Sequence, residues 1–249
     1  MKLHIIACEI FTRELSAAIA RSPNRASVKF LPFKLHQQGG KAMALELQKA
    51  IDSVTDACDA IALAFCLCNN GLLGLKAGKA PLVAFRSHDC VACLLGSREA
   101  FQKEHDAVPG SYWLSVGWLE LGGDASDQLA SLPSEPAPDD PRWLDLVAKY
   151  GDDNAAFLWE EQRKMLANYE RLVYIDTGVG PQAKLREDAR QRAQTLGLRF
   201  DERAGGLNWI SSLVDGPWDE ARFVVAQPGQ HFAPRYDGSI VAAEAEKES

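Results

Sequence analysis

Residues 59–65, Asp-Ala-Ile-Ala-Leu-Ala-Phe, constrain the fold more than any other stretch of the chain. From its second position the run is apolar at successive residues, so a strand formed here is apolar on both faces. Strands of this kind are typical of the interior of a parallel sheet that helices cover on both sides. We therefore expect an α/β protein with residues 59–65 as an interior strand.

Other short apolar runs alternate with helical patterns along the chain. We predict further strands at 2–7, 26–31, 81–85, 111–116, 171–175, 198–202 and 222–226. We predict helices at 10–21, 41–55, 90–95, 97–106, 142–150, 153–169, 182–196 and 206–213. This alternation predicts a doubly wound, mostly parallel sheet with helices on both faces. It fits one continuous sheet and also two Rossmann-like lobes with a cleft between them.

The 249 residues suffice for one large α/β domain or for two lobes. Residues 121–141 are rich in Gly, Ser, Asp and Pro, which predicts a loop or linker. We therefore place an N-terminal lobe at 1–120, a C-terminal lobe at 142–236 and a flexible, solvated tail at 237–249.

The net charge of −7 argues against nucleic acid or an anionic membrane as the main partner. No apolar run approaches the roughly 20 residues needed to cross a bilayer. We interpret residues 2–7 as a first strand and not as a targeting segment. These features predict a cytoplasmic protein that acts on a small molecule.

Reactive side chains follow four of the predicted strands, at the point where each strand ends. They are Cys8 with Glu9, then Cys66, Cys68, Asn69 and Asn70, then His88, Asp89 and Cys90, and finally Asp176 with Thr177. Ligands of open parallel sheets bind beyond the carboxyl ends of the strands, where these ends lie side by side. Residues 86–98 form the densest such stretch and carry the N-terminal lobe's main site.

Cys8, Cys68, His88 and Cys90 form the predicted metal-ligand set. Three thiolates and one imidazole suit tetrahedral zinc (Zn2+) or another soft-ligand metal. A site that uses three of these ligands leaves a position for a water or a substrate thiol. Glu9 or Asp89 would serve as acid or base. The predicted substrate-binding residues are Asn69, Asn70, Gly71, Asp176 and Thr177.

Packing is the competing explanation for the cysteines, because free cysteine is among the most buried residue types. All six lie in the first 93 residues, and clustered thiols of a cytoplasmic chain are more often metal-binding, catalytic or buried than disulfide-bonded. We assign Cys58, Cys66 and Cys93 to packing. Cys90 and Cys93 also have the spacing of a redox pair at a helix N-terminus. Their apolar flanks favour a buried helix instead.

The remaining histidines lie in contexts that favour surface or packing roles. They are His4, His36, His105 and His231. The chain has no Walker loop, no G-x-G-x-x-G and no G-x-S-x-G, so these motifs point to no nucleotide or serine chemistry.

Five blocks within residues 3–180 resemble, in order and rough spacing, the prokaryotic family catalogued as domain of unknown function sixteen thirty-eight. They are Ala7-Cys8-Glu9, Cys68-Asn69-Asn70-Gly71 with Gly74-Leu75, His88-Asp89-Cys90 with Leu95-Gly96-Ser97-Arg98-Glu99, Tyr112-Trp113-Leu114 with Gly117-Trp118-Leu119-Glu120, and Tyr174-Ile175-Asp176-Thr177-Gly178. Family members tend to be associated with corrinoid-dependent methyl-transfer systems, so the resemblance implies methylamine, betaine or one-carbon metabolism. It implies that positions matching Cys8, Cys68, His88 and Cys90 recur, while Cys66 and Cys93 depart from the family pattern.

Three functions remain open. The first is a zinc-dependent enzyme, a transferase or lyase acting on a small thiol, amine or methyl donor. The second is a metal-free enzyme whose nucleophile is Cys68 or Cys90 paired with His88. The third is an accessory or chaperone protein whose partner is a corrinoid-dependent methyltransferase or its corrinoid protein.

Overall fold

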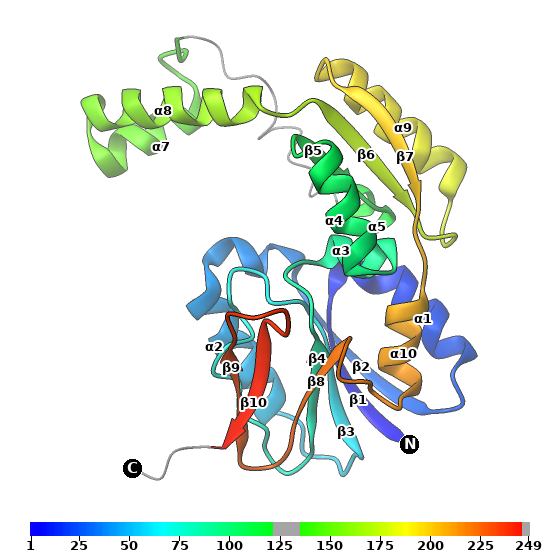
Figure 1. The fold of residues 1–249 in the computed structure, drawn as a ribbon. Helices are drawn as coiled ribbons and strands as arrows, with labels where there is room; N and C mark the ends of the chain where they lie inside the picture. Colours follow the sequence, from blue (N-terminus) through cyan, green and yellow to red (C-terminus); the bar gives the residue numbers. More distant parts are fainter. Residues whose placement is uncertain (122–134, 246–249) are drawn as a thin grey trace.

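The computed structural model describes residues 1–121 and 135–245. It is a mixed α/β structure with a five-stranded, mostly parallel sheet of order β2-β1-β3-β4-β8. A three-stranded sheet of order β5-β6-β7 and a two-stranded sheet of β9 and β10 complete it (Figure 1). The predicted α/β class with a mostly parallel sheet is therefore confirmed.

The five-stranded sheet contains the most deeply buried strands of the protein. β1 pairs in parallel with β2 and β3, and β3 pairs in parallel with β4. All residues of β3 and β4 are buried, as the continuous apolar run of β3 predicts. The strands are β1 (Lys2–Cys8), β2 (Arg25–Leu31), β3 (Ala60–Ala64), β4 (Leu82–Phe85) and β8 (Phe223–Ala226).

Helices lie on both sides of this sheet. The helix α2 (Gly40–Asp52) covers one side, and α1 (Thr12–Arg21) and α10 (Asn208–Asp215) cover the other (Figure 1). Each of the three buries leucines against the strands, Leu47 in α2, Leu15 in α1 and Leu213 in α10. Two short 3-10 helices, η1 (Glu9–Phe11) and η2 (Phe33–Gln38), follow β1 and β2. Beyond β4 the chain forms α3 (Cys90–Leu95) and α4 (Arg98–Ala107).

The three-stranded sheet is entirely parallel and consists of β5 (Ser111–Leu114), β6 (Arg171–Asp176) and β7 (Arg199–Ala204). The helices α5 (Val116–Glu120) and α9 (Gln182–Thr195) contribute to a second apolar cluster with β5 and β6. Between β5 and β6 in sequence, α7 (Pro141–Tyr150) and α8 (Asp152–Ala167) form a helical pair that projects away from both sheets (Figure 1).

The sheets divide the chain differently from the predicted lobes. Strand β5, which we placed in the N-terminal lobe, pairs with β6, and β8, which we placed in the C-terminal lobe, pairs antiparallel with β4. A short apolar strand carries no signal for its partner, so its place in the sequence does not reveal which sheet it joins. Within the predicted linker at 121–141, residues 122–134 lie outside the described residues.

The predicted flexible tail at 237–249 is wrong for the segment that forms β10 (Val241–Ala245). This strand pairs antiparallel with β9 (Gln230–Pro234), and the side chains of Val241 and Phe232 are fully buried in the main core. Burial of these apolar residues holds the segment in place. Residues 246–249 of the predicted tail lie outside the described residues.

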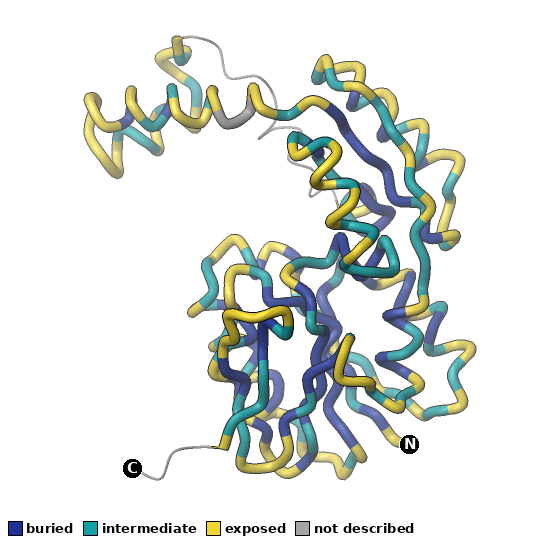
Figure 2. The backbone as a smooth tube through the Cα atoms, in the orientation of Figure 1, coloured by how far each residue is buried: buried dark blue, intermediate teal, exposed yellow. Residues whose placement is uncertain are grey.

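The buried backbone is concentrated in the five-stranded sheet and in β6, whereas α7 and α8 are mostly exposed (Figure 2). Within residues 1–121 and 135–245, none of the helices combines the length and the apolar character needed to span a bilayer.

Candidate functional site

A cavity of about 350 Å³ lies at the carboxyl ends of β1, β3 and β4. Its volume falls at the lower end of the range typical for small-molecule sites. The structure thus brings together the predicted ligands Cys8, Cys68, His88 and Cys90, which are far apart in sequence. The complete lining is Cys8, Ile10, Phe11, Phe33, His36, Met43, Phe65, Cys66, Cys68, Asn69, His88, Asp89, Cys90, Val91 and Trp118.

The cavity thiols come from three segments of the chain. Cys8 ends β1, Cys66 and Cys68 follow β3, and Cys90 begins α3. Burial raises the pKa of each of these thiols, for Cys8 to about 11. Neighbouring thiols raise it further, since Cys66 and Cys8 act on Cys68, and Cys68 acts on Cys90. Without a cation the four thiols therefore keep their protons at neutral pH.

The other two cysteines lie off the cavity. The sulfur of Cys93 is 3.5 Å from that of Cys66, and both residues are buried. Cys58 lies just before β3, at the opposite end of that strand from the cavity, and is half-buried. Cys66, which lines the cavity, and Cys93, which lies behind it, therefore form a buried thiol pair.

The loop that carries Cys68 has an unusual backbone. Cys68, Asn69 and Asn70 have φ angles of 37°, 55° and 65°, in the left-handed region that non-glycine residues rarely adopt. The main-chain N–H of Cys68 donates to the carbonyl of His88 at 2.9 Å, which ties the loop to the segment after β4. Backbone strain of this kind persists only where surrounding contacts enforce it, and it clusters at functional sites.

A glycine lets the neighbouring helix approach this loop. A Cβ atom on Gly40, the first residue of α2, would lie 1.9 Å from the carbonyl oxygen of Asn69. The side-chain amide of Asn69 also donates to the carbonyl of His36 at 3.0 Å. Gly71, predicted to bind substrate, instead packs against Met43, and Asn70 is exposed.

Asp89 caps helix α3. Its Oδ1 atom accepts hydrogen bonds from the main-chain N–H groups of Val91 at 2.9 Å and Ala92 at 3.4 Å. Burial is the main reason that the pKa of Asp89 is raised, and the two N–H groups oppose that shift. Asp89 and His88 also line a second cavity, of about 460 Å³, beside Arg98. The predicted acid–base residue therefore reaches the thiol cavity while it orders the helix that carries Cys90.

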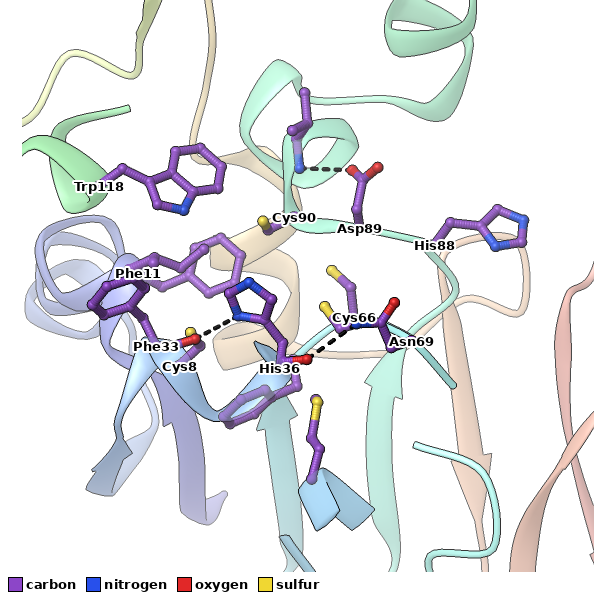
Figure 3. Close-up of a pocket in the computed structure, with 15 residues that line it drawn as sticks. Cys8, Phe11, Phe33, His36, Cys66, Asn69, His88, Asp89, Cys90 and Trp118 are labelled. Atoms are coloured by element: carbon purple, nitrogen blue, oxygen red, sulfur yellow. Dashed lines mark hydrogen bonds between the residues drawn. The ribbon is translucent and has the colours of Figure 1, made fainter. Parts of the chain in front are cut away.

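The two histidines of the cavity differ in orientation. Figure 3 shows the ring of His88 turned away from the sulfurs of Cys8, Cys66 and Cys90, and His88 is exposed. The ring of His36 lies among these sulfurs in the same view, with its Nδ1 atom 2.5 Å from the carbonyl oxygen of Phe33. The surface or packing role that we assigned to His36 missed its place on the cavity wall, since a short 3-10 helix has no periodicity that would reveal it.

Besides Asn70 and Gly71, three more predicted site residues do not line this cavity, namely Glu9, Asp176 and Thr177. The Oε2 atom of Glu9 accepts from the main-chain N–H of Phe33 at 3.2 Å. Asp176 pairs with Arg186 at 2.8 Å, and Thr177 donates to Glu14 at 2.8 Å. Asp176 ends β6 and Thr177 follows it, and because β6 belongs to the other sheet, the strand-end rule did not bring them to the thiols.

The cavity has the donor chemistry of a soft-metal site but not yet its geometry. Among the residues described, no three side chains of His, Cys, Asp or Glu are already arranged to hold a metal ion. The sulfur donors nevertheless suit zinc or copper(I) better than calcium or magnesium. Side-chain rotation would have to bring them together around an ion.

The family model described as a protein of unknown function (DUF1638) matches residues 30–214. This range covers most of the chain and contains Cys68, His88 and Cys90, but it begins after Cys8. Comparisons with the curated proteins and with the solved structures found no match.

Proposed function

The chain belongs to the DUF1638 family of proteins of unknown function, and from this premise we propose that it binds one soft metal ion, preferably zinc, through Cys8, Cys68 and Cys90. One observation carries the proposal. Three cysteines from the ends of β1 and β3 and from the start of α3 line one cavity. Thiols from separate segments that meet at one strand edge suit a shared ligand better than independent packing does.

A metal ion also accounts for the burial of these thiols better than a free nucleophile does. A nucleophilic cysteine needs a lowered pKa and an electropositive setting. In this cavity burial and neighbouring sulfurs raise the pKa instead. Coordination to a cation deprotonates a thiol outright. The metal-free pairs Cys68/His88 and Cys90/His88 are therefore the weaker alternative.

We further propose that the site acts on a small thiol, amine or methyl donor as a transferase or lyase. With three protein ligands, zinc would keep a position open and would hold a substrate thiol as its thiolate. Phe11, Phe33 and Trp118 line the cavity and would exclude water from the bound substrate. Asn69 offers an amide for recognition, and Asp89 is the acid–base group at the wall. His88 stands outside our ligand set because of its orientation.

Trp118 belongs to α5, which follows β5 of the three-stranded sheet, so both sheet regions contribute to the cavity wall. We propose on this basis that the two sheet regions act as Rossmann-like lobes around the cleft. We also propose a cytoplasmic location and a role in corrinoid-dependent methyl transfer.

An accessory role is the second candidate function, and one observation favours it. The helical pair of α7 and α8 projects from the body (Figure 1). It exposes the large apolar residues Leu144, Tyr150 and Phe157. Exposed apolar groups of this kind are typical of a protein-docking surface. In this alternative the partner is a methyltransferase or its corrinoid protein.

Metal analysis of protein purified without a histidine tag tests the proposal. We expect close to one equivalent of zinc per chain, and loss of that zinc in Cys68→Ser and in Cys90→Ser. Cys58→Ser is the matched control and should keep its zinc, because Cys58 lies at the other end of β3. Substoichiometric zinc that survives the Cys68 and Cys90 changes would refute metal binding at this cavity.

A further inference from the structure

The cavity offers a nitrogen donor that the predicted ligand set does not contain. We infer that His36, and not His88, supplies the imidazole ligand of the metal centre through its Nε2 atom. This inference rests on the proposed function, because it names the fourth protein group of the same site. It changes the proposed centre from three sulfur ligands to three sulfurs and one nitrogen, so a substrate thiol would have to displace one protein ligand or expand the coordination to five.

The hydrogen bond at the far side of the ring fixes the tautomer of His36. A carbonyl oxygen only accepts hydrogen bonds, so the Nδ1 atom that lies 2.5 Å from the Phe33 carbonyl must carry the hydrogen. In the neutral ring Nε2 then has the free lone pair. Histidines that bind metals almost always donate their other ring N–H to a carbonyl, a carboxylate or a water in this way.

The ring is placed for this role. His36 lines the cavity together with Cys8, Cys68 and Cys90. In Figure 3 its hydrogen-bonded nitrogen faces Phe33, and its second nitrogen, one ring carbon away, points away from Phe33. Side-chain rotation would have to bring this nitrogen and the thiols together around an ion, because among the described residues no three such side chains are already arranged to hold one.

Two hydrogen bonds tie the turn that carries His36 to the segments that carry the cysteines. The carboxylate of Glu9, next to Cys8, accepts from the main-chain N–H of Phe33 at 3.2 Å. The amide of Asn69, next to Cys68, donates to the carbonyl of His36 at 3.0 Å. Glu9 and Asn69 are thus positioning residues for the imidazole. Such outer contacts around a ligand are what hold a metal-binding ring in register.

X-ray absorption at the zinc edge tests the inference, because the spectrum separates sulfur from imidazole ligands independently of any activity. We expect the wild-type protein to show three sulfurs and one imidazole. His36→Ala should lose the imidazole signature, and its zinc affinity should fall by more than the roughly 10- to 100-fold that loss of a supporting group costs. His88→Ala is the matched control and should keep both the spectrum and the affinity.

His36→Gln guards against a folding defect, because its amide can still donate to the Phe33 carbonyl. It should keep the wild-type circular dichroism and still lose the imidazole signature. An imidazole signature that persists in His36→Ala and His36→Gln, or that disappears in His88→Ala, would overturn the inference while metal binding stands. Wild-type protein that binds no zinc would overturn the proposed function and this inference together.

Discussion

The five-stranded and three-stranded sheets are stabilised by different means. In the first, every residue of β3 and β4 is buried, and all six cysteines lie on its strands or in the segments that flank them. The second centres on the buried guanidinium of Arg171, which binds Glu104 at 3.0 Å and Asp201 at 2.8 Å. Arg203 adds a contact to Glu104 at 2.7 Å, so the charges form a network.

This difference supports the place where we propose the chemistry of the molecule. An apolar sheet provides the dry surroundings in which thiols stay protonated until a soft ion binds. A network of arginines and carboxylates fixes strands in place but leaves no soft donor. The second region contributes to the site only a wall, through Trp118. One substitution should therefore lower the stability of the three-stranded sheet region without affecting zinc, and another should weaken the proposed metal site of the five-stranded sheet.

The largest effect is expected from Arg171→Met in the three-stranded sheet. The side chain is only 2% exposed, and its removal leaves Glu104 and Asp201 short of a buried partner. Breaking a buried ion pair costs about 3–5 kcal/mol, and we expect about 3 kcal/mol because both carboxylates keep other arginines. Urea unfolding measures this loss. The zinc content of the folded protein should not change.

Arg199→Met is the control for that prediction. Arg199 also pairs with Asp201, at 3.1 Å, but its side chain is 58% exposed, so the expected cost is below about 1 kcal/mol. Equal losses for the two variants, or loss of zinc in Arg171→Met, would contradict the separation of the two regions.

The next largest effect is expected from Gly40→Ala beside the proposed metal site. The added Cβ would lie 1.9 Å from the main-chain oxygen of Asn69, which must shift together with the Cys68 loop. We expect a loss of about 1–3 kcal/mol in the free energy of unfolding, as for other overpacked sites. We also expect weaker zinc binding, measured by competition with a chelator.

Gly78→Ala is the matched control, because a Cβ atom there meets nothing within 4 Å. Its unfolding free energy should stay within about 0.5 kcal/mol of the wild-type value. Zinc binding that is unchanged in Gly40→Ala would show that the Cys68 loop is not part of the site.

The interior of the five-stranded sheet could be predicted from the sequence, because a strand that is buried on both faces is apolar at successive positions. Ala60–Ala64 is apolar at every position, and that pattern fits an interior strand and little else. The same rule brought Cys8, Cys68 and Cys90 to one edge. It could not reveal that Phe223–Ala226 pairs antiparallel with β4, because strand direction leaves no trace in composition.

The position of His36 on the cavity wall could not be predicted from the sequence for a similar reason. His36 lies in a 3-10 helix, and its orientation depends on the carbonyl of Phe33 and on the Asn69 loop, which lies 33 residues away in sequence. His88 stands directly beside Asp89 and Cys90, and this adjacency made it the natural choice. Neighbours in sequence point their side chains in different directions, and only the fold decides which one enters the cavity.

A smaller effect is expected from Thr177→Val, at the contact between α1 and the end of β6. The Thr177 hydroxyl donates to Oε1 of the buried Glu14, whose Oε2 atom has no partner among the described residues. Loss of one partner of a buried polar group costs about 1–3 kcal/mol. We expect the lower part of that range, measured by urea unfolding.

The cost of Thr177→Val should depend on pH. Burial raises the pKa of Glu14, and the Thr177 hydrogen bond opposes this by favouring the ionised form. The pKa of Glu14 is higher in the folded than in the unfolded state, so protonated Glu14 favours the folded state. This contribution to the free energy of unfolding is fully present below about pH 4.5 and is lost as pH rises through the folded pKa. Without Thr177 the folded pKa rises further, so the gap to wild type should widen with pH. Thr195→Val, at an exposed hydroxyl, should show no such trend.

The smallest effect is expected from Phe157→Ser in α8. The side chain is 64% exposed on the helical pair that projects from the body, so it stabilises neither sheet (Figure 1). Its substitution should change the unfolding free energy by less than about 0.5 kcal/mol and leave the zinc content unaltered. A loss above 1 kcal/mol in dilute protein would mean that Phe157 is covered in solution. The helical pair would then be a third region, stabilised by a contact that neither sheet provides.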